Sequence, residues 1–298
     1  MRRTRQPRTR TNREPYQASK VESINSRVYS TGGLDINTNL GEGYGPWRMP
    51  GESELLPFVT SANIACGAHA GDPVLMEAAL EEARYNGLAL GAHIGYPDLA
   101  GFGRREMHLH AGELRSHVIY QLGALAGVAK TLGFEITQVR PHGFLYRQMS
   151  HDVRIAITVA KAIADFDRWL VLIGPSGSNL QTASEKAGIR VAGEVLVDRL
   201  YDGNGNLVQH AHPRAVLKDP RAILNQAANL IRNRSITAAD GTTVKMDFQT
   251  IHVHPQMVEA TYVAEQVRLM ISDACPLTSE PYAIDQEYYP SSSVSWAD

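Results

Sequence analysis

Residues 59–87 read VTSANIACGAHAGDPVLMEAALEEARYNG and contain one complete unit of the fold. The opening residues are short and mostly apolar, as is typical of a strand that is buried on both faces of a parallel sheet. Asp72 suits a helix N-cap, Pro73 suits the first helical position, and Gly87 suits the point where a helix ends. The stretch therefore predicts a strand over 59–66 followed by a helix over 73–85.

The same alternation of a short strand and a longer helix recurs along the chain. Further strands are predicted over 34–39, 88–93, 137–141, 170–173, 191–197 and 250–253. Further helices are predicted over 112–132, 153–166, 179–186, 220–232 and 255–271. Seven strand–helix units favour a parallel sheet with right-handed crossovers, either open or closed. We expect the closed form, a seven-stranded TIM-like β/α barrel, because the glycine-rich run 41–45 contains an acidic residue and opens no helix, unlike a dinucleotide-binding loop.

Two tails of opposite charge flank the expected barrel domain at 31–275. Residues 1–30 contain eight basic and two acidic residues and few large apolar ones, which predicts a disordered basic tail. An Arg-rich, acid-poor start is also a feature of organelle transit peptides, so import remains an alternative to a cytoplasmic location. Residues 276–298 contain four acidic residues and no basic ones, and we expect a second, acidic tail there.

Composition excludes several classes of protein. The chain of 298 residues is 43% hydrophobic and 20% charged, which is ordinary for a soluble globular protein. It has no apolar run of the roughly 18–20 residues that a membrane span needs, so we expect no membrane partner. Its net charge of −2 creates no global field that attracts nucleic acid. Two cysteines are too few for a disulfide framework, and Cys66 suits a small core residue.

Polar and ionisable side chains collect where the predicted strands end. In chain order these are Asn37, Asn39, Glu42, Asn63, His69, Asp72, His93, Arg140, His142, Glu194, Asp198, Arg199, His252 and His254. In a β/α barrel the carboxyl ends of the strands meet at one mouth, where active sites lie. Each residue also has a structural interpretation: Asp72 as a helix cap, for example, or Glu194 and Arg199 as a buried pair that holds a loop.

The sequence leaves a metal site open. Histidine and aspartate are ligand types for Zn²⁺ and other divalent ions, and His69, Asp72, His93 and His142 are the main candidates, with Asp198 and His254 as further ones. The spacing matches no diagnostic metal motif. We expect His252 and His254 to point to opposite faces of their strand and not to form a chelating pair.

A pair of carboxylates is predicted on the sixth strand. In an extended strand, Glu194, Leu196 and Asp198 share one face, on which successive side chains are about 6–7 Å apart at a rise of ~3.3 Å per residue. Two carboxylates on one face of a partly dry site should have different pKa values, as a general acid and a general base require.

Several of these stretches together resemble a known family. They are 37–45 (NTNLGEGYG), 61–73 (SANIACGAHAGDP), 91–105 (GAHIGYPDLAGFGRR), 120–125 (YQLGAL), 140–146 (RPHGFLY) and 194–201 (EVLVDRLY). In this order they resemble the LamB/YcsF family, the A-type component of the bacterial-type ATP-dependent 5-oxoprolinase. The resemblance implies a barrel of the glycoside hydrolase/deacetylase type. It also implies that a small lactam, 5-oxoproline, is opened to L-glutamate with ATP as co-substrate, together with B- and C-type partner subunits. Whether ATP binds to this chain, whether a divalent metal takes part and whether the chain forms a homo-oligomer stay open.

The resemblance suggests roles for the polar residues at the mouth. Glu42 or Asp198 is the candidate general base, and His142, Arg140 and Arg199 are candidates for stabilising the developing oxyanion or phosphate. The expected substrate-binding residues are Asn37, Asn63, His69, Asp72, His93, Glu194 and His254.

The chain also departs from the family pattern. Asn39 and Arg140 stand where the family usually has aspartate and lysine, and Pro255-Gln256 replaces a usual Gly-Asp. Arginine keeps the charge of lysine but not its geometry. Two alternatives therefore remain: a metal-dependent amidohydrolase or carbohydrate deacetylase on the same barrel, and a paralogue with altered catalysis.

Overall fold

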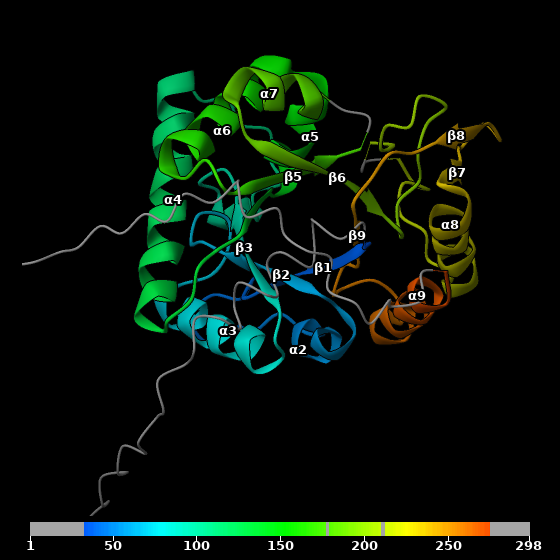
Figure 1. Ribbon diagram of the computed structural model, residues 1–298, viewed down its shortest axis with the longest axis horizontal. Coiled ribbons are helices and arrows are strands. Elements are labelled where there is room, and N and C mark those ends of the chain that lie inside the picture. The colour runs from blue at the N-terminus through cyan, green and yellow to red at the C-terminus, as the bar shows by residue number, and fades with distance from the viewer. Residues whose placement is uncertain (1–32, 177–178, 210–211, 275–298) are drawn as a thin grey trace, which may run out of the picture.

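A closed barrel of parallel strands forms the centre of the molecule (Figure 1). The structure, a computed structural model, describes residues 33–176, 179–209 and 212–274. The barrel strands are β1 (Asp35–Leu40), β2 (Ser61–Ala65), β3 (Ala89–Ile94), β4 (Gln138–Pro141), β5 (Val171–Pro175), β6 (Arg190–Leu196) and β9 (Thr250–His252). Each strand pairs with the next in parallel, and β9 closes the barrel between β6 and β1. The prediction of a seven-stranded β/α barrel is confirmed.

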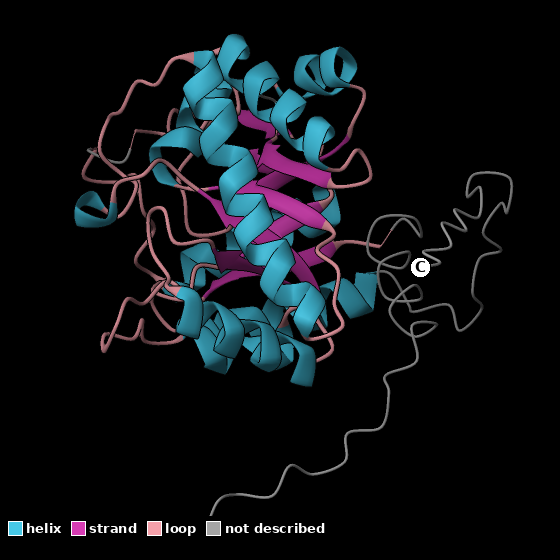
Figure 2. Cartoon of the chain, turned by 90° about the vertical axis from the view of Figure 1, so that its left-hand side faces the viewer, coloured by secondary structure: helices cyan, strands magenta, loops and turns pink. Residues whose placement is uncertain are grey.

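Helices cover the outside of the barrel, as Figures 1 and 2 show. The six predicted helices are present as α3 (Pro73–Tyr85), α4 (Ala111–Thr131), α6 (Val153–Phe166), α7 (Leu180–Ala187), α8 (Pro220–Asn233) and α9 (Ala260–Ala274). Their buried faces join the outer faces of the strands in one large apolar core. Helix α9 begins five residues later than expected, because residues 255–259 form turns and Glu259 has a φ of 49°. Among the described residues, no helix combines the length and the apolar character that crossing a bilayer requires.

Some elements were not predicted. They are α2 (Glu52–Leu55), the 3₁₀ turns η1 (Leu56–Phe58) and η2 (Leu99–Gly101), α5 (Gly143–His151), and the antiparallel hairpin of β7 (Ser235–Thr237) and β8 (Thr243–Lys245). Helix α5 follows β4 with His142 as the N-cap, whose side chain makes no capping hydrogen bond, so the usual start signal is missing. The two expected tails, 1–30 and 276–298, lie outside the described residues.

Asp72 is a structural residue of α3. Its carboxylate accepts hydrogen bonds from the backbone N–H groups of Val74 at 2.9 Å, Leu75 at 3.0 Å and Gly45 at 2.8 Å. The expectation that Asp72 is a metal ligand is therefore wrong, because both of its oxygens are used to cap the helix and to hold the loop after β1. The capping interpretation of the same residue is correct.

The barrel interior is polar. Alternate residues of β1 face inward, and Asn37 donates to Glu194 Oε1 at 2.9 Å and to Thr250 Oγ1 at 2.7 Å. The Oδ1 atom of Asn37 accepts a hydrogen bond from Asn63 Nδ2 at 2.8 Å and lies 2.6 Å from His252 Nδ1. All of these side chains are buried. The network links four strands across the barrel and forms a fixed floor beneath the mouth.

His252 and His254 lie next to each other. Their ring centroids are 4.4 Å apart and the rings are perpendicular. The expectation of opposite faces is wrong, because side chains two residues apart on a strand point to the same side.

Loss of the Asp72 cap should weaken the fold. We expect Asp72→Ala to lower the free energy of unfolding by about 1–2 kcal/mol, the typical cost of removing a helix cap. Asp72→Asn should retain most of the stability, since asparagine caps helices about as well as aspartate. Urea denaturation followed by circular dichroism measures both, and equal stability of the alanine variant and wild type would contradict the assignment.

Buried His252 should make the fold sensitive to acid. Burial, followed by the nearby charge of Arg140, holds the pKa of His252 well below its usual 6.5. Below pH 6.5 the unfolded chain therefore binds a proton that the folded chain does not, so stability decreases as the pH falls. His252→Gln should reduce the slope of unfolding free energy against pH between about pH 6.5 and 5 by up to ~1.4 kcal/mol per pH unit.

The difference between variant and wild type is the quantity to measure for His252. Burial also raises the pKa of Glu52 to about 7, and its contribution to stability changes with pH in the opposite sense. Both proteins are denatured across this pH range in EDTA, and the free energy of unfolding of one is subtracted from that of the other. The contribution of Glu52 is common to both and drops out of the difference. Parallel curves would show that His252 is not held neutral by the fold.

Candidate active site and metal centre

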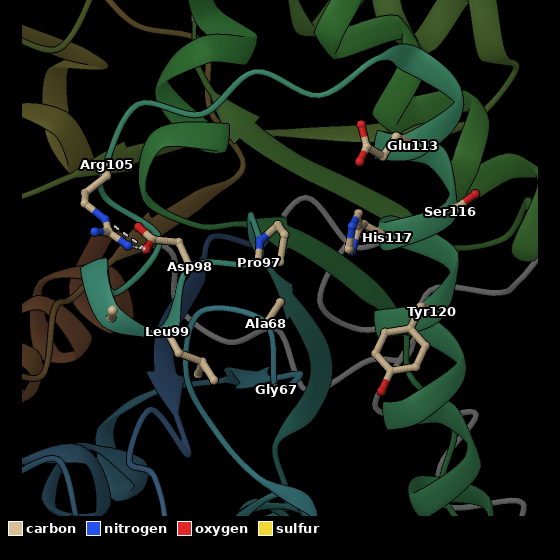
Figure 3. A pocket seen from close by; sticks show the side chains of 11 residues that line it. Gly67, Ala68, Pro97, Asp98, Leu99, Arg105, Glu113, Ser116, His117 and Tyr120 are labelled. Atoms are coloured by element: carbon tan, nitrogen blue, oxygen red, sulfur yellow. Dashed lines mark hydrogen bonds and ion pairs between the residues drawn. The ribbon is translucent and has the colours of Figure 1, made fainter.

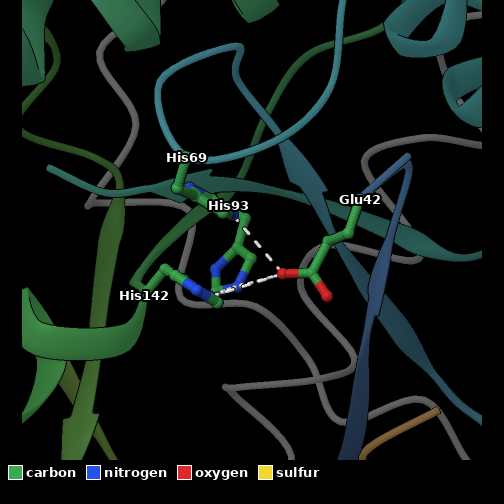
Figure 4. A group of neighbouring side chains, drawn as sticks. All are labelled: Glu42, His69, His93 and His142. Carbon is green, nitrogen blue, oxygen red and sulfur yellow. Dashed lines mark hydrogen bonds and ion pairs between the residues drawn. The ribbon is translucent and has the colours of Figure 1, made fainter. Parts of the chain in front are cut away.

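Four buried side chains meet at the mouth of the barrel (Figure 4). Glu42 follows β1, His69 follows β2, His93 lies on β3, and His142 is the N-cap of α5 after β4. Glu42 Oε1 lies 3.4 Å from His69 Nε2, 3.3 Å from His93 Nε2 and 3.3 Å from His142 Nδ1. One ligand atom from each residue falls within 4.8 Å of all the others.

The hydrogen bonds of two histidines define which ring nitrogens face the centre without a proton. His93 Nδ1 lies 2.9 Å from the carbonyl oxygen of Arg140, and His142 Nε2 lies 2.8 Å from that of Phe102. A carbonyl oxygen only accepts, so both of these nitrogens carry hydrogen. The lone pairs of His93 Nε2 and His142 Nδ1 then face each other at 3.0 Å. Burial lowers the pKa of His93 to about 4 and that of His142 well below 6.5, so both rings are neutral near pH 7.

His69 and Glu42 complete the cluster. The His69 ring stacks on His142 with centroids 3.9 Å apart, and among the described residues neither of its ring nitrogens has a hydrogen-bond partner. Burial opposes ionisation of Glu42, but His69 and His93 hold the pKa of its carboxyl group well below the usual 4.5. One ionised carboxylate, two neutral imidazoles with inward-facing lone pairs and the adjacent His69 ring form a donor set that suits Zn²⁺ or a similar divalent ion.

The cluster therefore could hold a divalent metal ion. Three of the four main metal candidates from the sequence, His69, His93 and His142, lie in it. The fourth, Asp72, does not, and Glu42 supplies the carboxylate in its place.

Two glycines make room for the stacked histidines. A Cβ atom on Gly103 would lie 2.7 Å from the Cβ of His69 and 2.9 Å from Cδ2 of His142. A Cβ atom on Gly143 would lie 2.3 Å from the carbonyl oxygen of Gly103, and its φ of 55° also favours glycine. Both glycines belong to the motifs that carry the family resemblance, and their role is to let the loops after β3 and β4 meet.

Glu52 is a supporting residue that the sequence analysis missed. Its carboxylate accepts hydrogen bonds from the backbone N–H groups of Gly41 at 3.1 Å and Glu42 at 3.0 Å. It thereby fixes the backbone that carries Glu42. The only sequence signal for it is an acidic residue in the short segment before β2, which looks like an ordinary exposed loop residue.

Arg140 and Glu194 form a buried ion pair beside the cluster. The guanidinium donates to both carboxylate oxygens, from Nε at 2.8 Å and from Nη2 at 2.7 Å. Asn39 connects this pair to the cluster, since its Nδ2 lies 3.4 Å from Glu42 Oε2 and its Oδ1 lies 3.4 Å from Arg140 Nη1. An amide can donate to Glu42 and accept from Arg140, whereas an ionised aspartate could only accept.

Asp198 is paired with His254. His254 Nδ1 lies 2.9 Å and 3.0 Å from the two carboxylate oxygens of Asp198. Asp198 is 4% exposed, whereas the His254 side chain is 25% exposed. Burial would raise the pKa of Asp198, but the adjacent His254 outweighs it and lowers that pKa below the usual 3.8.

The expected acid–base pair of Glu194 and Asp198 is not present. Strand β6 ends at Leu196, so Asp198 lies in the following turn and the strand spacing does not apply to it. Each carboxylate has a separate basic partner, Arg140 for Glu194 and His254 for Asp198. The two groups therefore do not share a proton.

Arg199 holds the loop that follows β6. Its Nε donates to the carbonyl oxygen of Ala215 at 3.1 Å, and its Nη2 donates to that of Val208 at 2.8 Å. Asn37 and Asn63 lie in the floor network described above, below the metal cluster. Of the predicted substrate-binding residues, His254 and the helix cap Asp72 are partly exposed, and the other five are buried.

A cavity of about 800 Å³ lies beside the cluster (Figure 3). It is formed by the loops after β2 and β3 and by α4, with Ala68, Pro97 and Tyr120 among its lining residues. None of the four cluster residues lines it, although Ala68 directly precedes His69. The cavity therefore borders the candidate site but does not contain its chemistry.

Comparison with known proteins agrees with the motifs. The A-type component of 5-oxoprolinase from Methylococcus capsulatus is 42% identical over 239 residues, which are 80% of this chain and 92% of that protein. The 5-oxoprolinase component of the same type from Pyrococcus abyssi is 38% identical over 240 residues, 80% and 94% of the two chains.

A solved structure gives the same picture. The crystal structure of the lactam utilization protein from Thermus thermophilus has a TM-score of 0.76 and 36% sequence identity, covering 81% of this chain and 97% of that one. The family pattern described as LamB/YcsF family matches residues 34–282. The chain therefore belongs to the LamB/YcsF family.

Proposed function

We propose that this chain is the A-type component of a 5-oxoprolinase. With B- and C-type partner subunits it opens the lactam ring of 5-oxoproline to give L-glutamate, with ATP as co-substrate. The relatives named as 5-oxoprolinase components of this type support the choice of substrate, since they align over more than 90% of their own length. The observation that carries the chemistry is the buried cluster of Glu42, His69, His93 and His142 at the barrel mouth.

The cluster suits a group that activates an amide carbonyl. A lactam is a resonance-stabilised amide, so its carbonyl must be polarised, or its oxygen phosphorylated, before water attacks. A divalent cation held by the four residues would act there as a Lewis acid. Glu52 and Gly103 keep the ligands in place, because one fixes the Glu42 backbone and the other leaves space for the histidine rings.

We assign the general base to His254, with Asp198 as its positioning residue. The Asp198 carboxylate faces His254 Nδ1 and leaves Nε2 of the partly exposed ring available at the mouth. In this role Nε2 takes a proton from the attacking water while the new C–O bond forms at the lactam carbonyl. The proton then passes to the lactam nitrogen as the C–N bond breaks, and Asp198 stabilises the transient imidazolium. The phosphoryl group that ATP places on the carbonyl oxygen remains as an acyl phosphate, which a second water hydrolyses to phosphate and the carboxylate of L-glutamate.

Arg140 and Glu194 have an indirect role in this proposal. Their charges neutralise each other in the barrel, and Asn39 transmits their position to Glu42. Asn37 and Asn63 support Glu194 and His252 from below. These residues contribute to catalysis by holding the side chains of the mouth in one fixed geometry.

Metal content tests the cluster directly. We expect the chain to bind about one Zn²⁺ after dialysis against the ion and then against metal-free buffer, because four converging donors form a complete site. Glu42→Gln and His93→Ala should lower the metal content at least tenfold, as measured by mass spectrometry of the metal. His117→Ala, a histidine that lines the cavity outside the cluster, is the matched control. Equal metal content in all four proteins would contradict a site at Glu42.

Replacement of Asp198 tests the role of His254 as the general base. Asp198→Asn should lower kcat for glutamate release from 5-oxoproline and ATP, in the presence of B- and C-type partners, by about 10²–10⁴-fold, the usual range for general acid–base catalysis. The fold should persist, since asparagine is isosteric and still able to accept from His254. A wild-type rate with unchanged pH dependence would move the base elsewhere, with Glu42 the next candidate.

A second function is favoured by the same cluster: metal-dependent hydrolysis of an amide or N-acetyl sugar without ATP or partner subunits. The two proposals differ in a simple assay. The purified chain alone, loaded with Zn²⁺, should leave N-acetylated sugars and 5-oxoproline intact if the first proposal holds. Hydrolysis by the isolated chain that is abolished by a chelator would favour the second.

A further inference from the structure

Three arginines that follow the carboxyl ends of barrel strands belong to none of the ion pairs found among the described residues. They are Arg104 in the loop after η2, Arg147 on α5 and Arg199 after β6. Two other arginines near the mouth have carboxylate partners: Arg105 pairs with Asp98, and Arg140 pairs with Glu194. Like charges repel, so such a gathering costs energy unless a bound anion compensates it.

Arg104 and Arg147 are neighbours. Arg147 Nη2 donates to the carbonyl oxygen of Arg104 at 3.3 Å, which brings the loop and the helix together. Burial lowers the pKa of Arg147 below its ordinary value, and the charges of Arg199 and Arg104 add to this effect. The carboxylate of Glu106 opposes the shift.

Aromatic rings hold two of the guanidinium groups in position. The Arg104 guanidinium carbon lies 5.0 Å from the centroid of the Phe102 ring, and that of Arg147 lies 5.5 Å from the Phe144 ring. An arginine that packs on an aromatic face loses less conformational freedom when it binds a ligand. Such ordering is consistent with a built site and less so with freely moving surface charges.

The group lies next to the candidate active site. The Phe102 ring that supports Arg104 is also in edge contact with His142, with centroids 5.0 Å apart, and with His69, at 5.8 Å. Arg199 directly follows Asp198, the residue paired with His254. The arginines thus follow the ends of β3, β4 and β6, the same edge of the barrel that carries the metal cluster and the Asp198–His254 pair.

We propose that Arg104 and Arg147 bind a phosphoryl group of a nucleoside triphosphate. Guanidinium groups match phosphate oxygens through paired N–H donors. A carboxylate carries one negative charge, which one arginine neutralises. A phosphoryl group carries close to two negative charges, which match two arginines. This inference rests on the proposed function and specifies which residues of this chain take the co-substrate.

Binding to the full chain tests the proposal without turnover. Titration calorimetry with ATP, inorganic phosphate and 5-oxoproline in EDTA at low ionic strength compares wild type with Arg104→Gln and Arg147→Gln. We expect each variant to bind ATP and phosphate at least tenfold more weakly, since each loses a charge-assisted hydrogen bond, and to bind 5-oxoproline as wild type does. Arg221→Gln, an exposed arginine in the first turn of α8, is the matched control and should bind all three probes normally.

Other outcomes are equally clear. Weaker binding of 5-oxoproline but not of ATP would overturn the proposal and assign the arginines to the substrate carboxylate. Equal weakening in Arg221→Gln would overturn it as well, because general electrostatic attraction would then explain the binding. If ATP binding depends on Arg104 and Arg147 but 5-oxoproline is not opened with any partner subunits, the phosphoryl site stands and the proposed reaction fails.

Discussion

Two neutral histidine nitrogens facing each other at 3.0 Å are the constraint on which the rest of the site depends. The carbonyl oxygens of Arg140 on β4 and of Phe102 in the loop after β3 bind the opposite nitrogens of His93 and His142, so neither ring can turn to relieve the contact. Glu42 brings a negative oxygen to the same point. Three electron-rich atoms held together in a buried place are unstable alone and stable around a cation. The supporting parts of the mouth, from Glu52 to the two glycines, serve to keep these atoms there.

The barrel could be predicted because its signals are local. A capped helix after a short apolar strand recurs along the chain, and each unit adds one strand to a parallel sheet. Helix α5 was missed because it begins at His142, a residue with a different task, and lacks a side-chain cap. The β7–β8 hairpin was missed because its two short strands pair antiparallel outside the barrel and do not follow the strand–helix alternation. The tails at 1–30 and 276–298 remain predictions.

The candidate site was predictable as a place but not as a set of contacts. The position of polar residues at strand ends identified Glu42, His69, His93 and His142, since the barrel brings those ends together. Which carboxylate pairs with which base depends on atoms of different strands. The sequence allows Asp72 to be either a helix cap or a metal ligand, and it predicts Glu194 and Asp198 as partners, whereas in the structure each of these two carboxylates pairs with another residue. Glu52 acts through backbone N–H groups, which leave no pattern in a sequence.

The contact between Gly103 and Gly143 has a consequence for how the sequence can diverge. The backbone N–H of Phe144 donates to the carbonyl oxygen of Gly103 at 2.8 Å, and a side chain on Gly143 would collide with that same oxygen. The loop after β3 and the start of α5 are therefore joined backbone to backbone. A side chain at either glycine fits only if the facing backbone or ring shifts, and such a shift would disturb the stacked rings of His69 and His142. Selection thus acts on the two glycines as one unit, and neither can drift alone.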